Sequence, residues 1–125
     1  MLQQLDDRLT ILVNGDVVVP QAAELAKKAA LKLQDAYGAL PVDQVNMLVT
    51  HLATALTRLE RGEAVQAPPE ALLAEITTSP LMEKAVQEIA WIEREWDSTL
   101  PDEEKQFLCV HYVSVLNQLT GGGNE

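Results

Sequence analysis

Apolar residues recur every three or four positions along most of the chain, the spacing that places them on one face of an α-helix. The clearest stripe lies between residues 42 and 61 and consists of Val45, Leu48, Val49, Leu52, Leu56 and Leu59. A second stripe, between residues 80 and 97, consists of Met82, Val86, Ile89 and Trp96. The alternation typical of strands is almost absent, and the only β-branched run, residues 17–19, is too short to build a sheet. The pattern predicts an all-α protein.

Proline and glycine mark the ends of the predicted helices. Proline is tolerated in the first helical turn, and glycine accepts the left-handed backbone that often follows the last turn. The prolines that precede apolar-periodic stretches are Pro20, Pro41, Pro68, Pro69, Pro80 and Pro101, and the glycines that follow such stretches are Gly15, Gly38 and Gly62. These signals predict helices at 3–14, 20–37, 42–61, 69–78, 80–97 and 101–119. We expect an N-terminal extension with a short helix at 1–19, a compact bundle of five principal helices at 20–119, and a disordered Gly-rich tail at 120–125.

The segment from residue 107 to residue 116 differs from the other predicted helices because it is apolar nearly all round. Only His111 and Ser114 are plainly polar in it. Such a helix is either central in its bundle or covered by a partner chain. Both interpretations stay open at this point.

Composition and charge exclude several classes of function. The chain has 125 residues, of which 47% are hydrophobic, enough for one domain with a real core. Its net charge of −10 argues against binding to nucleic acids or to anionic membranes, which both require clustered Lys and Arg. No run of residues has the length of a membrane span, and the N-terminus does not resemble a signal peptide. The single cysteine cannot form an intramolecular disulfide, which suits a reducing cytoplasm. Together with the lack of a signal peptide, this leads us to expect a cytoplasmic protein.

The two histidines are the only candidates for side-chain chemistry. His51 lies about 110° around its helix from the centre of the apolar stripe, at the border of the buried face. Thr54 and Arg58 follow it by three and seven positions, and Glu104 precedes His111 by seven, so each histidine has polar neighbours on its own side of a helix. A lone histidine in this setting is more often a hydrogen-bonded structural residue than a reactive one. The structural and the reactive interpretations therefore stand side by side.

Other kinds of site are poorly supported. Two histidines and one cysteine fall short of a zinc site, and no phosphate-binding loop is present, so we expect neither a metal nor a cofactor. Cys109 lies only two residues before His111, and on a helix the two side chains point in different directions. The acidic run 102–104 has a structural explanation, because negative charge in a first helical turn stabilises the helix dipole.

Two segments resemble the histidine motifs of the PTS-regulation domain (PRD) family. Residues 47–58, MLVTHLATALTR, resemble the first motif, a helical histidine followed by a short apolar run and an arginine seven positions later. Residues 100–113, LPDEEKQFLCVHYV, resemble the second, in which proline, acidic residues and an apolar helix lead to a histidine and an aromatic residue. The separation of the two histidines also matches the family. The resemblance covers about residues 20–119.

The resemblance implies a regulatory module and not an enzyme. PRDs are all-α bundles that associate as dimers, and their histidines accept phosphoryl groups from the bacterial phosphoenolpyruvate sugar phosphotransferase system (PTS). The donor is the histidine phosphocarrier protein or a sugar-permease subunit. By this resemblance His51 and His111 are phosphoacceptors and Arg58 is the arginine after the first of them, while Thr54 and Glu104 are further candidates to support the phosphate.

The chain departs from the family pattern in two respects. Many PRDs carry aspartate immediately before the first histidine, where this chain has Thr50. PRD regulators usually contain two PRDs and a nucleic-acid-binding domain, whereas this chain matches a single PRD. We therefore expect a stand-alone, homodimeric PRD that acts in trans on a partner protein in transcription regulation. The alternatives are a PRD-like adaptor that binds a protein or ligand without phosphorylation, and an all-α enzyme with a composite acid–base pair of His51 and Glu104.

Overall fold

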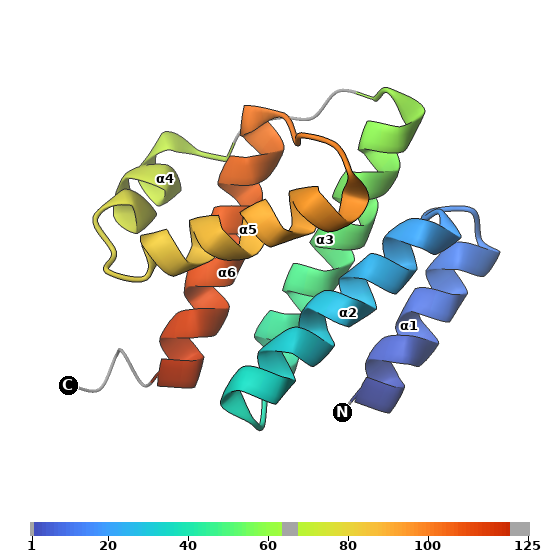
Figure 1. The fold of residues 1–125 in the computed structure, drawn as a ribbon, viewed down its shortest axis with the longest axis horizontal. Helices are drawn as coiled ribbons and strands as arrows, with labels where there is room; N and C mark the ends of the chain where they lie inside the picture. Colours follow the sequence, from blue (N-terminus) through green and yellow to red (C-terminus); the bar gives the residue numbers. More distant parts are fainter. Residues whose placement is uncertain (1, 64–67, 121–125) are drawn as a thin grey trace. The chain divides into compact units, whose positions relative to one another are not determined.

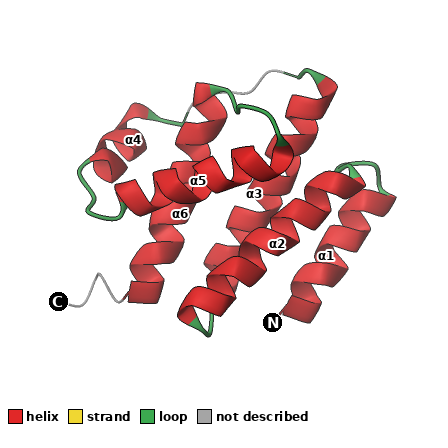
Figure 2. Ribbon diagram, viewed as in Figure 1, coloured by secondary structure: helices red, strands yellow, loops and turns green. Residues whose placement is uncertain are grey.

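The computed structural model describes residues 2–63 and 68–120. Within these ranges the regular secondary structure consists of α-helices joined by loops (Figures 1 and 2). The helices are α1 (Leu2–Asn14), α2 (Pro20–Tyr37), α3 (Val42–Arg61), α4 (Glu70–Thr77), α5 (Met82–Trp96) and α6 (Asp102–Thr120). The described ranges contain no strand. The prediction of an all-α protein with a short N-terminal helix and five principal helices is therefore confirmed at the level of its elements.

Proline predicts the starts of the helices well. Pro20 is the first residue of α2, while Pro41, Pro69 and Pro101 each come directly before the first residue of a helix. The predicted limits of α2 and α3 agree with the structure, and those of the other helices differ by at most two residues. Thr120, the first residue of the predicted tail, is the last residue of α6. Residues 121–125, which carry the rest of that prediction, lie outside the described residues.

Glycine directly follows three of the described helices, α1, α2 and α3, and two of these glycines have a positive φ. Gly38 and Gly62 follow α2 and α3 with φ angles of 86° and 72°, a backbone region that favours glycine. After α1, however, the left-handed residue is Asp16, with φ 60°, and not Gly15. Asp97, with φ 62°, ends α5 in the same way. Aspartate tolerates this conformation better than most side chains. Gly15 therefore marks the end of α1 without taking the left-handed backbone itself, and α5 ends without a glycine.

The helices divide into two compact units, residues 1–64 (unit 1) and residues 65–125 (unit 2). Unit 1 contains α1, α2 and α3, which run antiparallel to their neighbours in the sequence (Figure 1). Unit 2 contains α4, α5 and α6, with α6 packed against both of the others. The predicted limits of one bundle at 20–119 stay a prediction.

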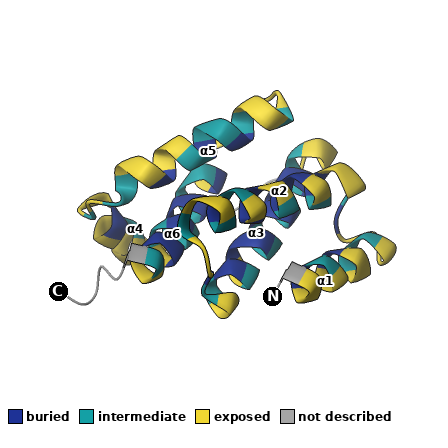
Figure 3. Cartoon of the chain, turned by 60° about the horizontal axis from the view of Figure 1, so that its bottom comes forward, coloured by how far each residue is buried: buried dark blue, intermediate teal, exposed yellow. Residues whose placement is uncertain are grey.

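The buried face of α3 is the one that the apolar spacing predicts (Figure 3). Its stripe is buried at Val45, Leu48, Val49, Leu52 and Leu56, whereas Leu59 is half-buried. The main partner of α3 in unit 1 is α2, whose buried side chains are largely alanines: Ala22, Ala26, Ala29 and Ala30. Small side chains on one helix allow a close approach of the other. This packing fixes α3, and with it the position of His51.

In unit 2 the stripe predicted for α5 is partly wrong. Val86 is 49% exposed, and the buried residues of this helix are Ala85, Ile89 and Ile92. Met82 and Trp96 are half-buried. The sequence pattern favoured the larger Val86 over its neighbour Ala85, although the smaller residue is the one that faces the core. Size alone does not tell which of two adjacent apolar residues is buried.

The all-round apolar character of α6 follows in part from its contacts inside unit 2. Both α4 and α5 pack against it. The buried apolar residues of α6 are Leu108, Cys109, Tyr112, Val115 and Leu116, and the half-buried ones include Phe107, Val110 and Val113. A helix with partners on two sides needs apolar residues on more than one stripe.

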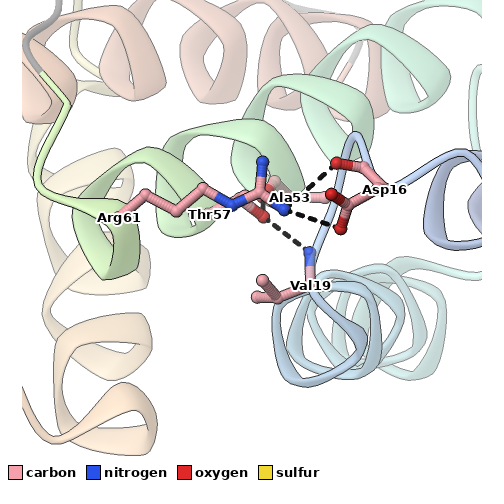
Figure 4. Close-up of polar contacts among 5 residues, drawn as sticks. All are labelled: Asp16, Val19, Ala53, Thr57 and Arg61. Atoms are coloured by element: carbon pink, nitrogen blue, oxygen red, sulfur yellow. Dashed lines mark hydrogen bonds and ion pairs between the residues drawn. The ribbon is translucent and has the colours of Figure 1, made fainter.

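Polar contacts link the loop between α1 and α2 to the C-terminal half of α3 (Figure 4). The backbone N–H of Val19 donates to Oγ1 of Thr57 at 3.0 Å, and the Thr57 hydroxyl donates to the carbonyl of Ala53 at 2.8 Å. Arg61 donates through Nη2 to the carbonyl and to Oδ1 of Asp16, both at 3.0 Å. Thr57 is 2% exposed, so its hydroxyl is the buried member of this set.

We expect Thr57→Val to lower the free energy of unfolding by about 1–2 kcal/mol, because valine keeps the shape of threonine but leaves the Val19 N–H without its acceptor. Chemical denaturation followed by circular dichroism measures the change. Thr10→Val is the matched control: the Thr10 hydroxyl also donates to a carbonyl four residues back, that of Asp6 at 2.9 Å, but Thr10 is exposed. Its effect should stay within about 0.5 kcal/mol. Equal losses in the two variants would contradict the role given to Thr57.

Candidate functional site

His51 lies in the middle of α3, at the border of its buried face. The residue is half-buried, as its angular position predicts, but its Nε2 atom is buried. The backbone next to the ring is fixed by Thr54, whose hydroxyl donates to the carbonyls of Thr50 and His51, both at 3.0 Å.

Two of the predicted supporting residues share α3 with His51. Arg58 is half-buried and lies seven positions later, about 20° around the helix and roughly 10 Å along its axis. It therefore places a cationic side chain on the same side of the helix as the imidazole. Thr54 lies closer, but its single hydroxyl hydrogen is already shared between two carbonyls. Its predicted role as a phosphate donor requires that it give up those bonds.

A further basic residue near His51 was missed from the sequence. Nε of Arg8, on α1, donates to Oγ1 of Thr50 at 2.9 Å. Thr50 directly precedes His51, so α1 places a guanidinium next to this part of α3. The two residues are 42 positions apart in the chain, and no local spacing connects them. Only the packing of α1 in unit 1 reveals the contact.

The second histidine lies in unit 2, on α6. His111 is half-buried, and Glu104, on the same helix, is 1% exposed. The other two acidic residues of the first turn, Asp102 and Glu103, are exposed, so the run acts as the predicted helix-start charge while its third member points inward. His51 belongs to unit 1 and Glu104 to unit 2. Their pairing as acid and base stays a prediction.

Cys109 is buried on α6 and is a poor nucleophile. Burial raises the pKa of its thiol, although the nearby positive charge of Lys105 acts in the opposite direction. A thiol with a raised pKa is protonated and unreactive at neutral pH.

The described ranges, 2–63 and 68–120, contain no group of three or more His, Cys, Asp or Glu side chains placed to hold a metal ion. No helix in the same part of the chain is both long enough and apolar enough to cross a bilayer.

The chain thus carries a half-buried histidine and a following arginine on α3, and a second half-buried histidine on α6. The model of the PRD domain family matches residues 24–115, well over half of the chain. The chain therefore belongs to the PRD domain family, a family of regulatory domains. Neither the curated proteins nor the solved structures yielded a match. The match includes all the predicted site residues, whereas α1 and Arg8 lie outside it.

Proposed function

We propose that this chain is a regulatory module of the bacterial sugar PTS that accepts phosphoryl groups on His51 and His111. In this proposal it is a cytoplasmic homodimer that acts in trans on a partner protein in transcription regulation. The observation that supports it best is the arrangement on α3, where a half-buried histidine and Arg58 share one side of a well-anchored helix inside the family match. Such a histidine is accessible enough to react and close enough to the core to affect packing.

The chemistry is transfer of a phosphoryl group between two imidazole rings. A ring nitrogen of the acceptor histidine uses its lone pair to attack the phosphorus, and a new P–N bond forms. The P–N bond to the donor ring breaks, and its electron pair returns to the donor nitrogen. The proton that the acceptor ring loses balances the one that the donor ring takes up. The donor is the histidine phosphocarrier protein or a sugar-permease subunit.

The regulatory effect follows from charge. A phosphoryl group adds negative charge to a chain that already carries −10, and at a half-buried position this charge is costly unless a cation compensates it. Arg58 is the cation that lies on the same side of α3 as His51. The balance between its attraction and the repulsion from acidic surroundings shifts the packing of α3 between two arrangements. The same negative charge suits docking to a donor with a basic rim around its own active histidine.

The buried Nε2 of His51 supports a second function. A ring whose nitrogen is enclosed fits a structural histidine, and the chain is then an adaptor that binds a protein or small ligand without phosphorylation. The two functions differ in a single property, the presence of phosphohistidine.

Incubation with radiolabelled phosphoenolpyruvate and the general PTS proteins separates the two functions. We expect acid-labile label on the wild-type chain and less label on His51→Ala and on His111→Ala. The double variant should carry no label. Omission of the phosphocarrier is the control and should also abolish labelling. An unlabelled wild type, or label unchanged in the double variant, would refute phosphorylation at these histidines.

A further inference from the structure

The contact between α1 and α3 places a positive charge beside the residue that precedes His51. Nε of Arg8 donates to the hydroxyl oxygen of Thr50 at 2.9 Å. Because Thr50 is uncharged, the bond orients the guanidinium without neutralising it. The bond also uses only one of its five N–H groups, and the remaining ones have the fork geometry that suits a phosphate.

The acidic residues next to Arg8 on α1 have other partners. Asp6 forms an ion pair with Lys27 of α2 at 2.9 Å. Asp7 accepts a hydrogen bond from Nε2 of Gln3 at 3.3 Å. Neither carboxylate is thus committed to Arg8, and its charge stays available to an anion.

The backbone that carries Arg8 is held firmly in unit 1. Leu5 and Leu9 are 0% and 3% exposed, and they anchor α1 on either side of Arg8 along the chain. The ion pair of Asp6 with Lys27 links the same part of α1 to α2. Arg8 is therefore presented from a fixed helix.

We propose that Arg8 is a second phosphate-binding residue of the His51 site. Its guanidinium, held on Thr50, binds the phosphoryl oxygens once His51 is modified, as a charge-assisted hydrogen-bond donor. Arg58 approaches along the axis of α3, whereas Arg8 approaches from Thr50, about 100° around the helix from His51. Helix α1, which lies outside the family match, thus becomes a cis-acting part of the site. The inference rests on the proposed phosphorylation of His51.

The test uses the full chain with His111→Ala, so that any label reports on His51. Phosphoramidate serves as a small donor that needs no protein docking, and the PTS proteins serve as the second donor. The rate of labelling and the lifetime of the label are measured for the His111→Ala chain, called the parent, and for the same chain with Arg8→Ala or Arg8→Lys added. We expect Arg8→Ala to slow labelling and shorten the lifetime by roughly three- to fivefold, the range of one exposed charge interaction. Arg8→Lys should restore part of both.

Arg61→Ala is the matched control, since it also removes one positive charge and one polar tie to α3, the contact with Asp16. It should change labelling less than twofold. High salt should shrink the effect of Arg8→Ala, because exposed charges are screened, whereas a purely structural role of Arg8 would not respond in this way.

The outcomes separate this inference from the proposed function. If the parent takes no label from either donor, the proposed function fails and the role of Arg8 fails with it. If the parent is labelled and both Arg8 variants match it in rate and lifetime, the role of Arg8 alone is overturned. If Arg8→Ala does not fold, Arg8→Lys and the salt dependence of labelling in the parent decide. The inference is overturned if Arg8→Lys is labelled as fast as the parent and the labelling rate of the parent does not depend on salt.

Discussion

Leu52→Ala is expected to lower the free energy of unfolding by about 2–5 kcal/mol. Leu52 is 0% exposed in the stripe of α3, and its truncation leaves a cavity that the surrounding helices fill only in part. Small domains are stable by only about 5–15 kcal/mol, so the loss is a large share of the total. Urea denaturation followed by the helical circular dichroism signal measures it directly.

Leu31→Ala is the matched control for this prediction. It removes the same atoms from a helix of the same unit, but Leu31 is 42% exposed on α2. Alanine also has a slightly higher helix propensity than leucine, so the change should stay within about 0.5 kcal/mol. If both variants lost the same stability, the stripe of α3 would not be the core that the structure describes.

The second large effect is a loss of stability at alkaline pH that depends on Tyr112. Burial raises the pKa of Tyr112 far above its usual range, and the negative charge of Glu88 adds to the shift. The folded state therefore keeps the phenol protonated, while the unfolded state ionises above about pH 10. Stability is fully present below that pH and falls by about 1.4 kcal/mol for each pH unit above it.

Tyr112→Phe should remove this part of the pH dependence. At pH 7 the substitution should not lower the free energy of unfolding and should raise it by at most about 1 kcal/mol. The reason is that the buried Tyr112 hydroxyl has no hydrogen-bond partner among the described residues. The buried thiol of Cys109 contributes its own alkaline loss in both proteins, so the difference between their pH profiles isolates Tyr112. Tyr37→Phe, at a half-buried position, controls for removal of a hydroxyl. Parallel profiles of wild type and Tyr112→Phe between pH 9 and pH 11 would show that the phenol is not enclosed.

Local signals in the sequence were sufficient for the helices. Proline marks the starts of α2 and α6, as Pro20 and Pro101, and glycine follows the last residues of α2 and α3. These signals act through backbone geometry that one or two residues determine. At the end of α1 the local signal gave the right boundary, but the left-handed residue is Asp16 and not Gly15. The conformation of Asp16 accompanies a bond with Arg61, which comes from another helix. Tertiary contacts of this kind are invisible to a local pattern.

The same limit applies to the candidate site. The position of His51 at the border of the core followed from helical periodicity, because the angle around a helix depends only on residue spacing. The burial of Glu104 did not follow, since an acidic residue in a first helical turn is usually solvated and only the packing of unit 2 shows otherwise. Arg8 was also missed, because its contact with Thr50 requires α1 to dock on a helix distant in the sequence.

The central claim is that His51 and His111 carry phosphoryl groups in the cell. Mass spectrometry of the full chain from bacteria growing on a PTS sugar, under conditions that preserve phosphohistidine, tests it most directly. We predict a phosphoryl group on the peptides that contain His51 or His111, and its loss after mild acid treatment. Unmodified peptides at both histidines, in samples where the phosphocarrier itself is detected in its phosphorylated form, would contradict the account.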